Sequence, residues 1–430
     1  MSFDFKKLFD NKIIKNFVIV FLGDGFSSVL TLLNLSIMIR VLGLNVSSSV
    51  NLVISYVLVF DTIFNFQSFN SIIKFLPQYI ISNDVNKIKQ YIKQGFILDI
   101  VTAIISFIFC NLCIAMVFRI FNLDKSLIRL INIYSFSILF NLTGTGIGII
   151  RVFDKFKYST YINVIVNSLK FIFYVLSFFV KVDMLYFIWV ELIFGIVNMI
   201  MILAFTKWIL NVTNIKYIFK TKVIWDKEFL KFNFYCNLMT TLDVPISHLT
   251  PFMINRYIGV EFISVYKLIE KIGGIIAKIA SPLVNIIYPE ISTKVSEGNI
   301  KSSLNLVKKL FFYIMLFGVI IFIFLGLSHK IWVNILILNG DKFIVNIMFY
   351  LSFVIFKFSF VGIYPLVLSL GCIKYNVNIV LIANLVYLLC IPILTGLFNI
   401  NGIIIAQFIQ VSLVIFMQIF IINRKLKFKV

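Results

Sequence analysis

The fold of this 430-residue chain is decided by one stretch, which reads Gly259-Val-Glu-Phe-Ile-Ser-Val-Tyr-Lys-Leu-Ile-Glu-Lys-Ile-Gly-Gly-Ile-Ile-Ala-Lys-Ile-Ala-Ser-Pro-Leu-Val-Asn-Ile-Ile-Tyr-Pro289. It is long and apolar enough to cross a bilayer as a helix, yet it carries Lys267, Lys271 and Lys278. At about 100° of rotation per helical residue, the three lysines fall within roughly 40° of one another, with Asn285 on the same side. The stretch predicts a membrane helix with a cationic stripe.

Lysines in a membrane span need a polar environment. A charge at mid-bilayer costs at least about 2.5–3.5 kcal/mol on insertion scales, so such residues should face a wet cavity or a partner rather than lipid. The expected partner of Lys267, Lys271 and Lys278 is an anion. Lys357, in a later apolar run, is expected to line the same interior. Arg129 and Lys170 either line an interior as well or extend their ammonium and guanidinium groups to the membrane surface.

The composition is that of a polytopic membrane protein. Hydrophobic residues make up 61% of the chain and charged residues only 13%, which excludes an ordinary soluble domain. Apolar runs of about twenty residues recur without the period-two alternation of a β-barrel, so the sequence predicts an all-α fold. The expected spans are 16–40, 48–73, 95–118, 126–150, 158–180, 184–206, 232–256, 260–287, 310–328, 343–369, 377–398 and 401–422.

The distribution of basic residues predicts the orientation. Of the 39 Lys and Arg residues, 26 fall at the termini and in one set of alternate loops, and 7 fall in the other set. By the positive-inside rule, both termini are expected to be cytoplasmic. Much of the net charge of +21 then reflects contact with anionic lipid headgroups and not with nucleic acid.

A weak internal repeat suggests two lobes. Asp10-Asn-Lys-Ile-Ile-Lys15 returns as Asp226-Lys-Glu-Phe-Leu-Lys231, and Met38-Ile-Arg-Val-Leu-Gly43 returns as Ile254-Asn-Arg-Tyr-Ile-Gly259. The repeat predicts two six-helix lobes, 1–206 and 232–430, joined by a cytoplasmic linker at 207–231. A pseudo-two-fold axis along the membrane normal would relate them around a central cavity, as in many transporters. Chance similarity between Ile- and Phe-rich segments is the competing explanation.

Polar residues at helical spacing are expected to line that cavity. They are Asp24, Thr31, Asn34, Asp61, Asn65, Asn237, Asp243, Asn285 and Lys357. Acids inside membrane spans are typical of ion or proton relays, and the candidates for ion coupling are Asp24, Asp61, Asp243 and Glu270. Ser and Thr hydroxyls often bond their own helix instead. Gly144-Thr-Gly-Ile-Gly148 lacks the lysine of a phosphate-binding loop and indicates close helix packing.

The sequence offers little basis for enzymatic chemistry. It has two histidines and five cysteines, with no His, Cys or Asp cluster at metal-ligand spacing and no nucleotide-binding motif. We therefore predict no catalytic residue, no metal and no cofactor. Uphill transport would draw on an H+ or Na+ gradient, and the sequence does not choose between the two ions.

The whole chain resembles the polysaccharide repeat-unit flippases (O-antigen, Wzx-type) of the multidrug/oligosaccharidyl-lipid/polysaccharide exporter superfamily. The local matches are Arg40-Val-Leu-Gly43, Gly148-Ile-Ile-Arg-Val-Phe-Asp-Lys-Phe156, and Tyr266-Lys-Leu-Ile-Glu-Lys271 followed by Tyr288-Pro-Glu290. Ser264 stands where that family commonly has glycine, and Ile269 where it commonly has a small residue. The resemblance implies alternating access that moves undecaprenyl-diphosphate-linked oligosaccharide to the periplasmic leaflet for lipopolysaccharide and other polysaccharide biosynthesis. It also implies a polymerase and a chain-length regulator as partners.

Two other functions are compatible with the sequence. An ion-coupled multidrug or organic-cation antiporter of the same superfamily would be expected to have an acidic cavity without this excess of lysines. A membrane-embedded glycan polymerase would be expected to carry a sizeable extracytoplasmic loop with catalytic residues, and the predicted loops here are short. The lysine stripe of 259–289 favours the flippase, with Lys267, Lys271 and Lys278 holding the diphosphate.

Overall fold

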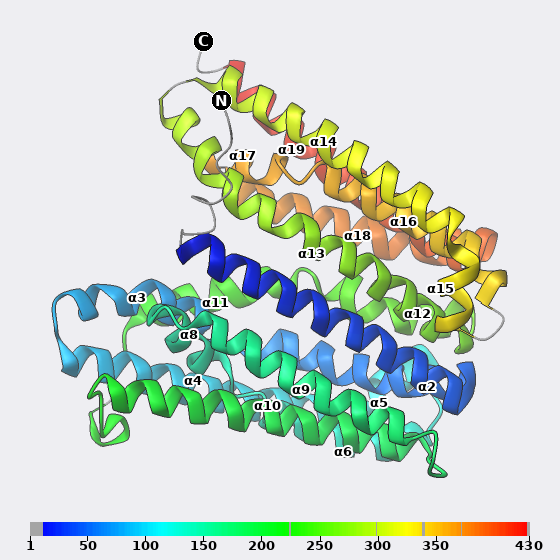
Figure 1. Cartoon of the computed structure of the whole chain (residues 1–430), viewed down its shortest axis with the longest axis horizontal. Helices are drawn as coiled ribbons and strands as arrows, with labels where there is room; N and C mark the ends of the chain where they lie inside the picture. The colour runs from blue at the N-terminus through cyan, green and yellow to red at the C-terminus, as the bar shows by residue number, and fades with distance from the viewer. Residues whose placement is uncertain (1–11, 223–224, 298, 338–339, 371, 428–430) are drawn as a thin grey trace. The chain divides into compact units, whose positions relative to one another are not determined.

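Every regular element that the structure describes is helical (Figure 1). The structure is a computed structural model, and it describes residues 12–222, 225–297, 299–337, 340–370 and 372–427. The chain first forms α2 (Lys12–Phe64), α3 (Phe69–Ile81), α4 (Val85–Leu112), α5 (Ile114–Phe121), α6 (Leu127–Tyr134), α7 (Phe136–Leu139), α8 (Gly144–Val152), α9 (Phe156–Leu176), α10 (Met184–Val212), η1 (Ile218–Lys220), α11 (Lys227–Thr241), η2 (Pro245–Leu249) and α12 (Thr250–Tyr257). It continues with α13 (Glu261–Ser296), α14 (Ile300–Leu327), α15 (His329–Leu336), η3 (Gly340–Phe343), α16 (Ile344–Ser359), α17 (Ile363–Ser369), α18 (Ile373–Phe398) and α19 (Ile400–Lys427).

Nine stretches of the described residues are long and apolar enough to cross a membrane. The first, Ile19–Ile81, contains two of the predicted spans, because α2 continues past Gly43. Gly43 has a φ of +77°, which bends the chain and which glycine adopts at little cost. The prediction of an all-α polytopic membrane protein is confirmed. The nine stretches do not count the spans directly, because one of them contains two predicted spans, so the number of twelve stays a prediction.

The predicted span 232–256 is not one continuous helix. Instead α11 ends at Thr241, a π-helix runs from Pro245 to Leu249, and α12 begins at Thr250. Pro245 has no N–H to donate to the preceding turn. The Thr250 hydroxyl donates to the carbonyl of Ile246 at 2.8 Å, within this irregular turn. The predicted span 260–287 also has no counterpart among the nine stretches. It falls inside α13.

The chain packs as two compact units. The first unit comprises Met1–Asn34 and Ser49–Phe252, and the second comprises Leu35–Ser48 and Met253–Val430. These limits follow packing and not the repeat, so α11 falls in the first unit, where it packs against α3. The division into lobes 1–206 and 232–430, with a linker at 207–231, stays a prediction.

Glycines bring α8 close to α3 within the first unit. A Cβ added at Gly148 would lie 2.7 Å from the Cβ of Ile72, and one added at Gly144 would lie 2.8 Å from the backbone nitrogen of Ser68. Real Cβ atoms do not approach neighbours this closely, so both positions require glycine. The interpretation of 144–148 as a helix-packing motif is confirmed.

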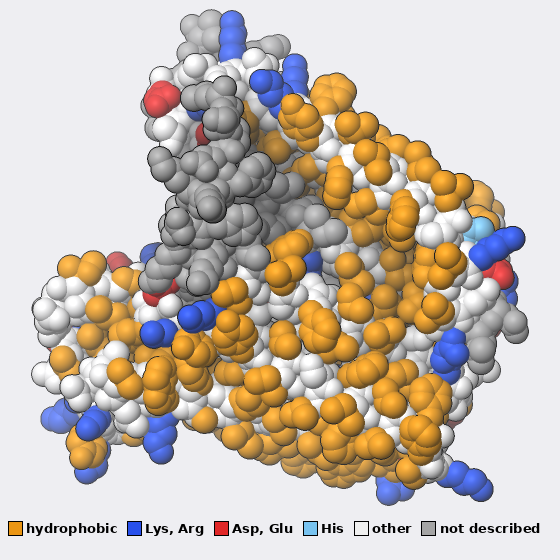
Figure 2. Space-filling model, in the orientation of Figure 1, with side chains coloured by type: hydrophobic (Ala, Val, Ile, Leu, Met, Phe, Trp, Pro, Cys, Tyr) orange, Lys and Arg blue, Asp and Glu red, His pale blue; other side chains and the backbone are white. Residues whose placement is uncertain are grey.

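Large hydrophobic side chains face outward from the long helices, as expected for contact with lipid. Phe324 and Leu316 of α14 are 68% and 62% exposed, and Ile193 of α10 is 49% exposed. Figure 2 shows hydrophobic side chains along α9 and α10, with Lys and Arg side chains near the ends of these helices. This pattern is typical of a helix surface that lies in a membrane.

Buried amides join the last two helices in the second unit. Gln410 of α19 donates to Asn384 of α18 at 3.0 Å, and Gln418 donates to Asn376 at 2.7 Å. Gln407 donates to the hydroxyl of Tyr266 on α13 at 2.8 Å. Because amides have few alternative partners in lipid, such bonds hold membrane helices together, at about 0.6–2 kcal/mol each. The bond from Gln407 to Tyr266 connects α19 to α13, the helix that carries the predicted lysine stripe.

Ser264, the residue that replaces a glycine common in the family, is fully buried at a close contact of the second unit. Its backbone N–H donates to the Ser48 hydroxyl at 2.9 Å, and its own hydroxyl lies 2.9 Å from that of Ser47. A small hydroxyl side chain is therefore accommodated where two segments approach closely.

The two glycines of the internal repeat share a backbone feature. Gly259, ahead of α13, has a φ of +145°, so the glycines that end Met38–Gly43 and Ile254–Gly259 both have positive φ.

Candidate functional site

The first candidate site lies where two membrane helices of the first unit are broken. Residues 65–68 separate α2 from α3, and residues 140–143 separate α7 from α8. The breaks meet, because the side-chain amide of Asn65 donates to the carbonyl of Asn141 at 3.3 Å. Broken membrane helices expose backbone groups, and transporters commonly place ion and substrate sites at such breaks.

The Asp61 carboxylate sits between these breaks. One of its oxygens accepts from Nδ2 of Asn65 at 2.8 Å, and the other accepts from Nδ2 of Asn141 at 2.7 Å. The Oδ1 atom of Asn65 is buried and has no hydrogen-bond partner among the described residues. Neutral amides hold the carboxylate in place without neutralising its charge. The cluster of Asp61, Asn65 and Asn141 can therefore take up a proton or a small cation.

Sequence reasoning identified Asp61 and Asn65 but missed Asn141. The sequence feature that could have identified Asn141 is a short polar segment inside an apolar run, Asn141-Leu-Thr-Gly144. In the structure this segment forms the break before α8. Asn237 of α11 joins this neighbourhood by donating to the carbonyl of Thr62 at 3.3 Å. Three of the predicted cavity-lining residues, Asp61, Asn65 and Asn237, thus gather around the end of α2.

Asp99 of α4 holds the first break from the other side. It is 1% exposed, and its carboxylate accepts three hydrogen bonds. They come from the backbone N–H of Ser68 at 2.9 Å, the backbone N–H of Thr145 at 2.8 Å and the Thr145 hydroxyl at 2.7 Å. Each donor lies at or next to a helix break. Asp99 therefore replaces the intrahelical acceptors that α3 and α8 lack at their first turns.

Asp226 fixes the start of α11. It accepts from the backbone N–H of Glu228 at 2.7 Å and from the hydroxyl of Tyr91 on α4. The Tyr91 hydroxyl first, and the N–H groups of Glu228 and Phe229 after it, lower the pKa of Asp226 below its ordinary value. The charged carboxylate thus links α11 to α4 at neutral pH.

The other predicted residues of the first unit are more dispersed. Asp24 of α2 is half-buried, and the Thr31 hydroxyl donates to the carbonyl of Ser28 at 2.9 Å, so this hydroxyl bonds its own helix. Asn34 is 4% exposed, and neither of its amide atoms has a hydrogen-bond partner among the described residues. Asp243 is exposed, between α11 and η2.

Lys170 shows that a cation inside a span can be paired within the protein. It forms an ion pair with Glu191, whose other oxygen accepts from the Tyr174 hydroxyl at 2.6 Å. The side chains of Lys170 and Glu191 are 15% and 18% exposed. Lys170 therefore faces a carboxylate partner inside the protein, which is one of the two environments expected for a cation in a membrane span.

The second candidate site is the lysine face of α13. The helix is continuous from Glu261 to Ser296, so its period keeps Lys267, Lys271 and Lys278 on one side. Lys267 pairs with Glu270 one turn away at 2.8 Å, whereas Lys271 is half-buried and Lys278 is exposed. Lys357 of α16 is exposed. Asn285 lies outside the residues whose side chains are described. This face carries more positive than negative charge, which suits an anionic ligand.

Comparisons with known proteins agree with this architecture. Residues 13–295 match a family model described as polysaccharide biosynthesis protein. An inward-facing multidrug resistance MATE family transporter of the MOP superfamily superposes with a TM-score of 0.71 at 14% identity, over 93% of this chain and 96% of that one. The outward-facing conformation of such a transporter gives a TM-score of 0.63 at 12% identity, over 95% of both chains.

A MOP superfamily transporter from Pyrococcus furiosus, described with a binding pocket of reverse polarity that suggests a different function, gives a TM-score of 0.63 at 14% identity over 96% of both chains. No curated protein sequence matches the chain significantly. The family match covers well over half of the chain, and the fold is that of transporters. The prediction of a multi-pass membrane protein with the fold of a transporter is confirmed. The chain belongs to the polysaccharide biosynthesis protein family and has the fold of the MATE transporters of the MOP superfamily.

Proposed function

We propose that this protein is a flippase for undecaprenyl-diphosphate-linked oligosaccharide repeat units. It moves them from the cytoplasmic to the periplasmic leaflet of a bacterial inner membrane, with both of its own termini in the cytoplasm. Family membership supports a role in polysaccharide biosynthesis. The observation that carries the proposal is the face of α13 with Lys267, Lys271 and Lys278, because a diphosphate needs cations in an otherwise apolar helix.

The mechanism follows from the chemistry of this cargo. Lys267, Lys271 and Lys278 hold the diphosphate, while the polyprenyl tail stays in the bilayer. Hydroxyl and amide side chains provide hydrogen bonds for the sugars. Alternating access then exposes the cargo first to one side of the membrane and then to the other. A polymerase and a chain-length regulator would use the product.

The experiment replaces the lysines one at a time in cells that depend on the protein for surface polysaccharide. Lys271→Ala and Lys278→Ala are expected to abolish surface polysaccharide and to leave lipid-linked repeat units on the cytoplasmic side. Lys271→Arg is expected to retain part of the activity, because the charge remains. Lys294→Ala is the matched control on the same helix, since Lys294 is paired with Glu290 at 2.8 Å.

Membrane levels of every variant are measured by immunoblot, so that lost protein is not mistaken for lost transport. Normal surface polysaccharide from the triple variant Lys267→Ala/Lys271→Ala/Lys278→Ala, at normal protein level, would refute the proposed mechanism. Equal loss from Lys294→Ala at normal protein level would show that the effect is not specific to Lys267, Lys271 and Lys278.

The Asp61 cluster is the proposed ion-coupling site, and it takes precedence over Asp24, Asp243 and Glu270. Among the described residues, its carboxylate is held only by the amides of Asn65 and Asn141. Asp61→Asn keeps the shape and removes the charge. It is expected to reduce gradient-driven transport in proteoliposomes at least tenfold, whereas an unchanged dependence on the H+ or Na+ gradient would exclude Asp61.

An ion-coupled antiporter for drugs or organic cations is the second candidate. It is favoured by the fold, since structures of multidrug resistance transporters superpose on this chain. Expression in a drug-sensitive host separates the two functions. A flippase leaves drug tolerance unchanged, whereas tolerance that rises and then disappears with Asp61→Asn would favour the antiporter.

A further inference from the structure

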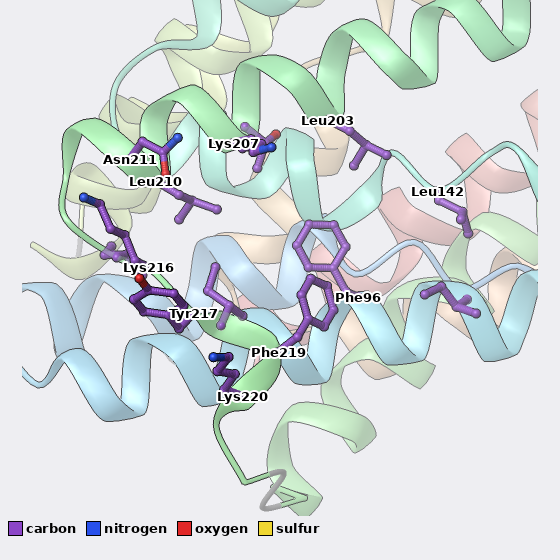
Figure 3. Close-up of a pocket in the computed structure, with 14 residues that line it drawn as sticks. Phe96, Leu142, Leu203, Lys207, Leu210, Asn211, Lys216, Tyr217, Phe219 and Lys220 are labelled. Carbon is purple, nitrogen blue, oxygen red and sulfur yellow. The ribbon is translucent and has the colours of Figure 1, made fainter.

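The first unit contains a cavity of about 780 Å³ that is separate from the Asp61 cluster (Figure 3). It lies between α4, the C-terminal part of α10 and the segment 215–220. Its walls are mostly apolar, with Phe96, Leu142, Leu203, Leu210 and Phe219 among the lining residues. The volume falls within the range of about 300–1,000 Å³ that is typical of small-molecule sites.

Three lysines line this cavity, and no acidic residue does. They are Lys207 of α10 and Lys216 and Lys220 of the segment that follows it. Figure 3 shows Lys207 on the helix beside Leu203, and Lys216 and Lys220 on the segment that closes the cavity. Within the described part of the chain, none of the three forms an ion pair with a carboxylate. The cavity thus combines apolar walls with uncompensated positive charge.

The segment that carries two of these lysines is held in place. Lys93 of α4 donates to the carbonyls of Phe219 and Thr221, each at 2.7 Å. Tyr217 has a φ of +61°, a left-handed conformation that a bulky side chain rarely adopts. Such conformations persist where the surroundings enforce them, and they concentrate at ligand sites. The two hydrogen bonds from Lys93 therefore hold the segment that carries Lys216 and Lys220 against α4.

We propose that this cavity binds an anionic phospholipid, with an acyl chain along the apolar walls and the phosphate beside Lys207, Lys216 and Lys220. Trp208 and Tyr217, which are 46% and 70% exposed, are aromatic residues of the kind found at the membrane surface. A small soluble anion would not contact the apolar walls, and a lipid without net charge would not compensate the charge of the lysines. The site would be occupied whatever the transported cargo is.

The test measures lipid binding to the purified full-length protein in neutral detergent. Fluorescent phosphatidylglycerol is titrated by anisotropy, and then displaced with unlabelled phosphatidylglycerol, phosphatidylcholine or inorganic phosphate. Lys207→Gln/Lys216→Gln/Lys220→Gln is expected to weaken phosphatidylglycerol binding about 100-fold, at roughly fivefold for each lysine near a lipid phosphate. Lys301→Gln/Lys308→Gln/Lys309→Gln removes the same charge from exposed positions of α14 and is expected to change binding little.

The apolar part of the site is tested separately. Leu203→Trp fills the cavity without changing charge and is expected to weaken binding. Phe219→Ala instead removes part of the apolar wall and is also expected to weaken binding. The Phe219 side chain is 63% exposed, so folding is less at risk at this position. Equal competition by phosphatidylcholine, displacement by inorganic phosphate alone, equal loss in the α14 control, or unchanged binding in both apolar variants would each overturn the proposal.

Discussion

Asp99 allows the sharpest prediction, because every hydrogen bond that it accepts is known. In Asp99→Ala the backbone N–H groups of Ser68 and Thr145 stay buried and lose their acceptor. The Thr145 hydroxyl can turn to the Ser68 hydroxyl, which lies 2.7 Å away. An unsatisfied buried donor costs about 1–3 kcal/mol, so two of them lower the free energy of unfolding by about 2–6 kcal/mol.

Asp99→Asn provides a graded comparison. The remaining carbonyl oxygen can still accept from Ser68, whereas the new NH2 group faces the N–H of Thr145. One donor is then unsatisfied, and the expected loss is about 1–3 kcal/mol. Reversible unfolding of the purified protein in SDS, followed by tryptophan fluorescence, measures both values. Glu228→Gln, at an exposed position, is the control.

Two results would refute this reasoning. An unchanged free energy of unfolding in Asp99→Ala would mean that the three hydrogen bonds do not stabilise the break between α2 and α3. Full stability of Asp99→Asn with complete loss of transport would instead make Asp99 a coupling acid, and Asp61 would lose its proposed precedence.

Two further predictions concern packing and pH. Gly148→Leu forces atoms into Ile72 and is expected to lower the free energy of unfolding by about 1–3 kcal/mol, whereas Gly195→Leu, where no atom lies within 4 Å of an added Cβ, should change it little in the same SDS titration. Asp226 has a lowered pKa in the folded protein, so its charged carboxylate stabilises the folded state at pH values above the ordinary carboxyl pKa. This stabilisation is lost as the pH falls through the pKa that Asp226 has in the folded state. Between pH 6 and pH 3, the free energy of unfolding should therefore fall less in Asp226→Asn than in the unchanged protein. An identical pH profile for the two proteins would mean that the hydrogen bond to Tyr91 contributes nothing to stability.

Much of the fold could be predicted because hydropathy reports the membrane directly. The long apolar runs became helices, and the glycines of 144–148 became a close contact, since a missing side chain at helical spacing has few other uses. The region 232–256 was harder. Polar residues and Pro245 made its helix ends depend on tertiary contacts, and three short elements resulted where one span was predicted.

The candidate site was only partly predictable for the same reason. Asp61 and Asn65 belong to one predicted span, so their spacing revealed them, but Asn141 joins them from the break before α8, 76 residues later in the sequence. The pairing of Lys170 with Glu191 likewise depends on how α9 packs against α10. Helical spacing shows which residues share a face, and it does not show what that face contacts.

The contact between Ser48 and Ser264 has a consequence for biosynthesis. The two residues are 216 positions apart, so at about 5–20 residues per second the later partner is made roughly 10–40 s after the earlier one. During that interval the hydroxyls of Ser47 and Ser48 are inserted without the residue that bonds them in the finished protein. Nascent chains that stop before α13 should therefore be recognised by membrane proteases, and chains that extend past it should be spared.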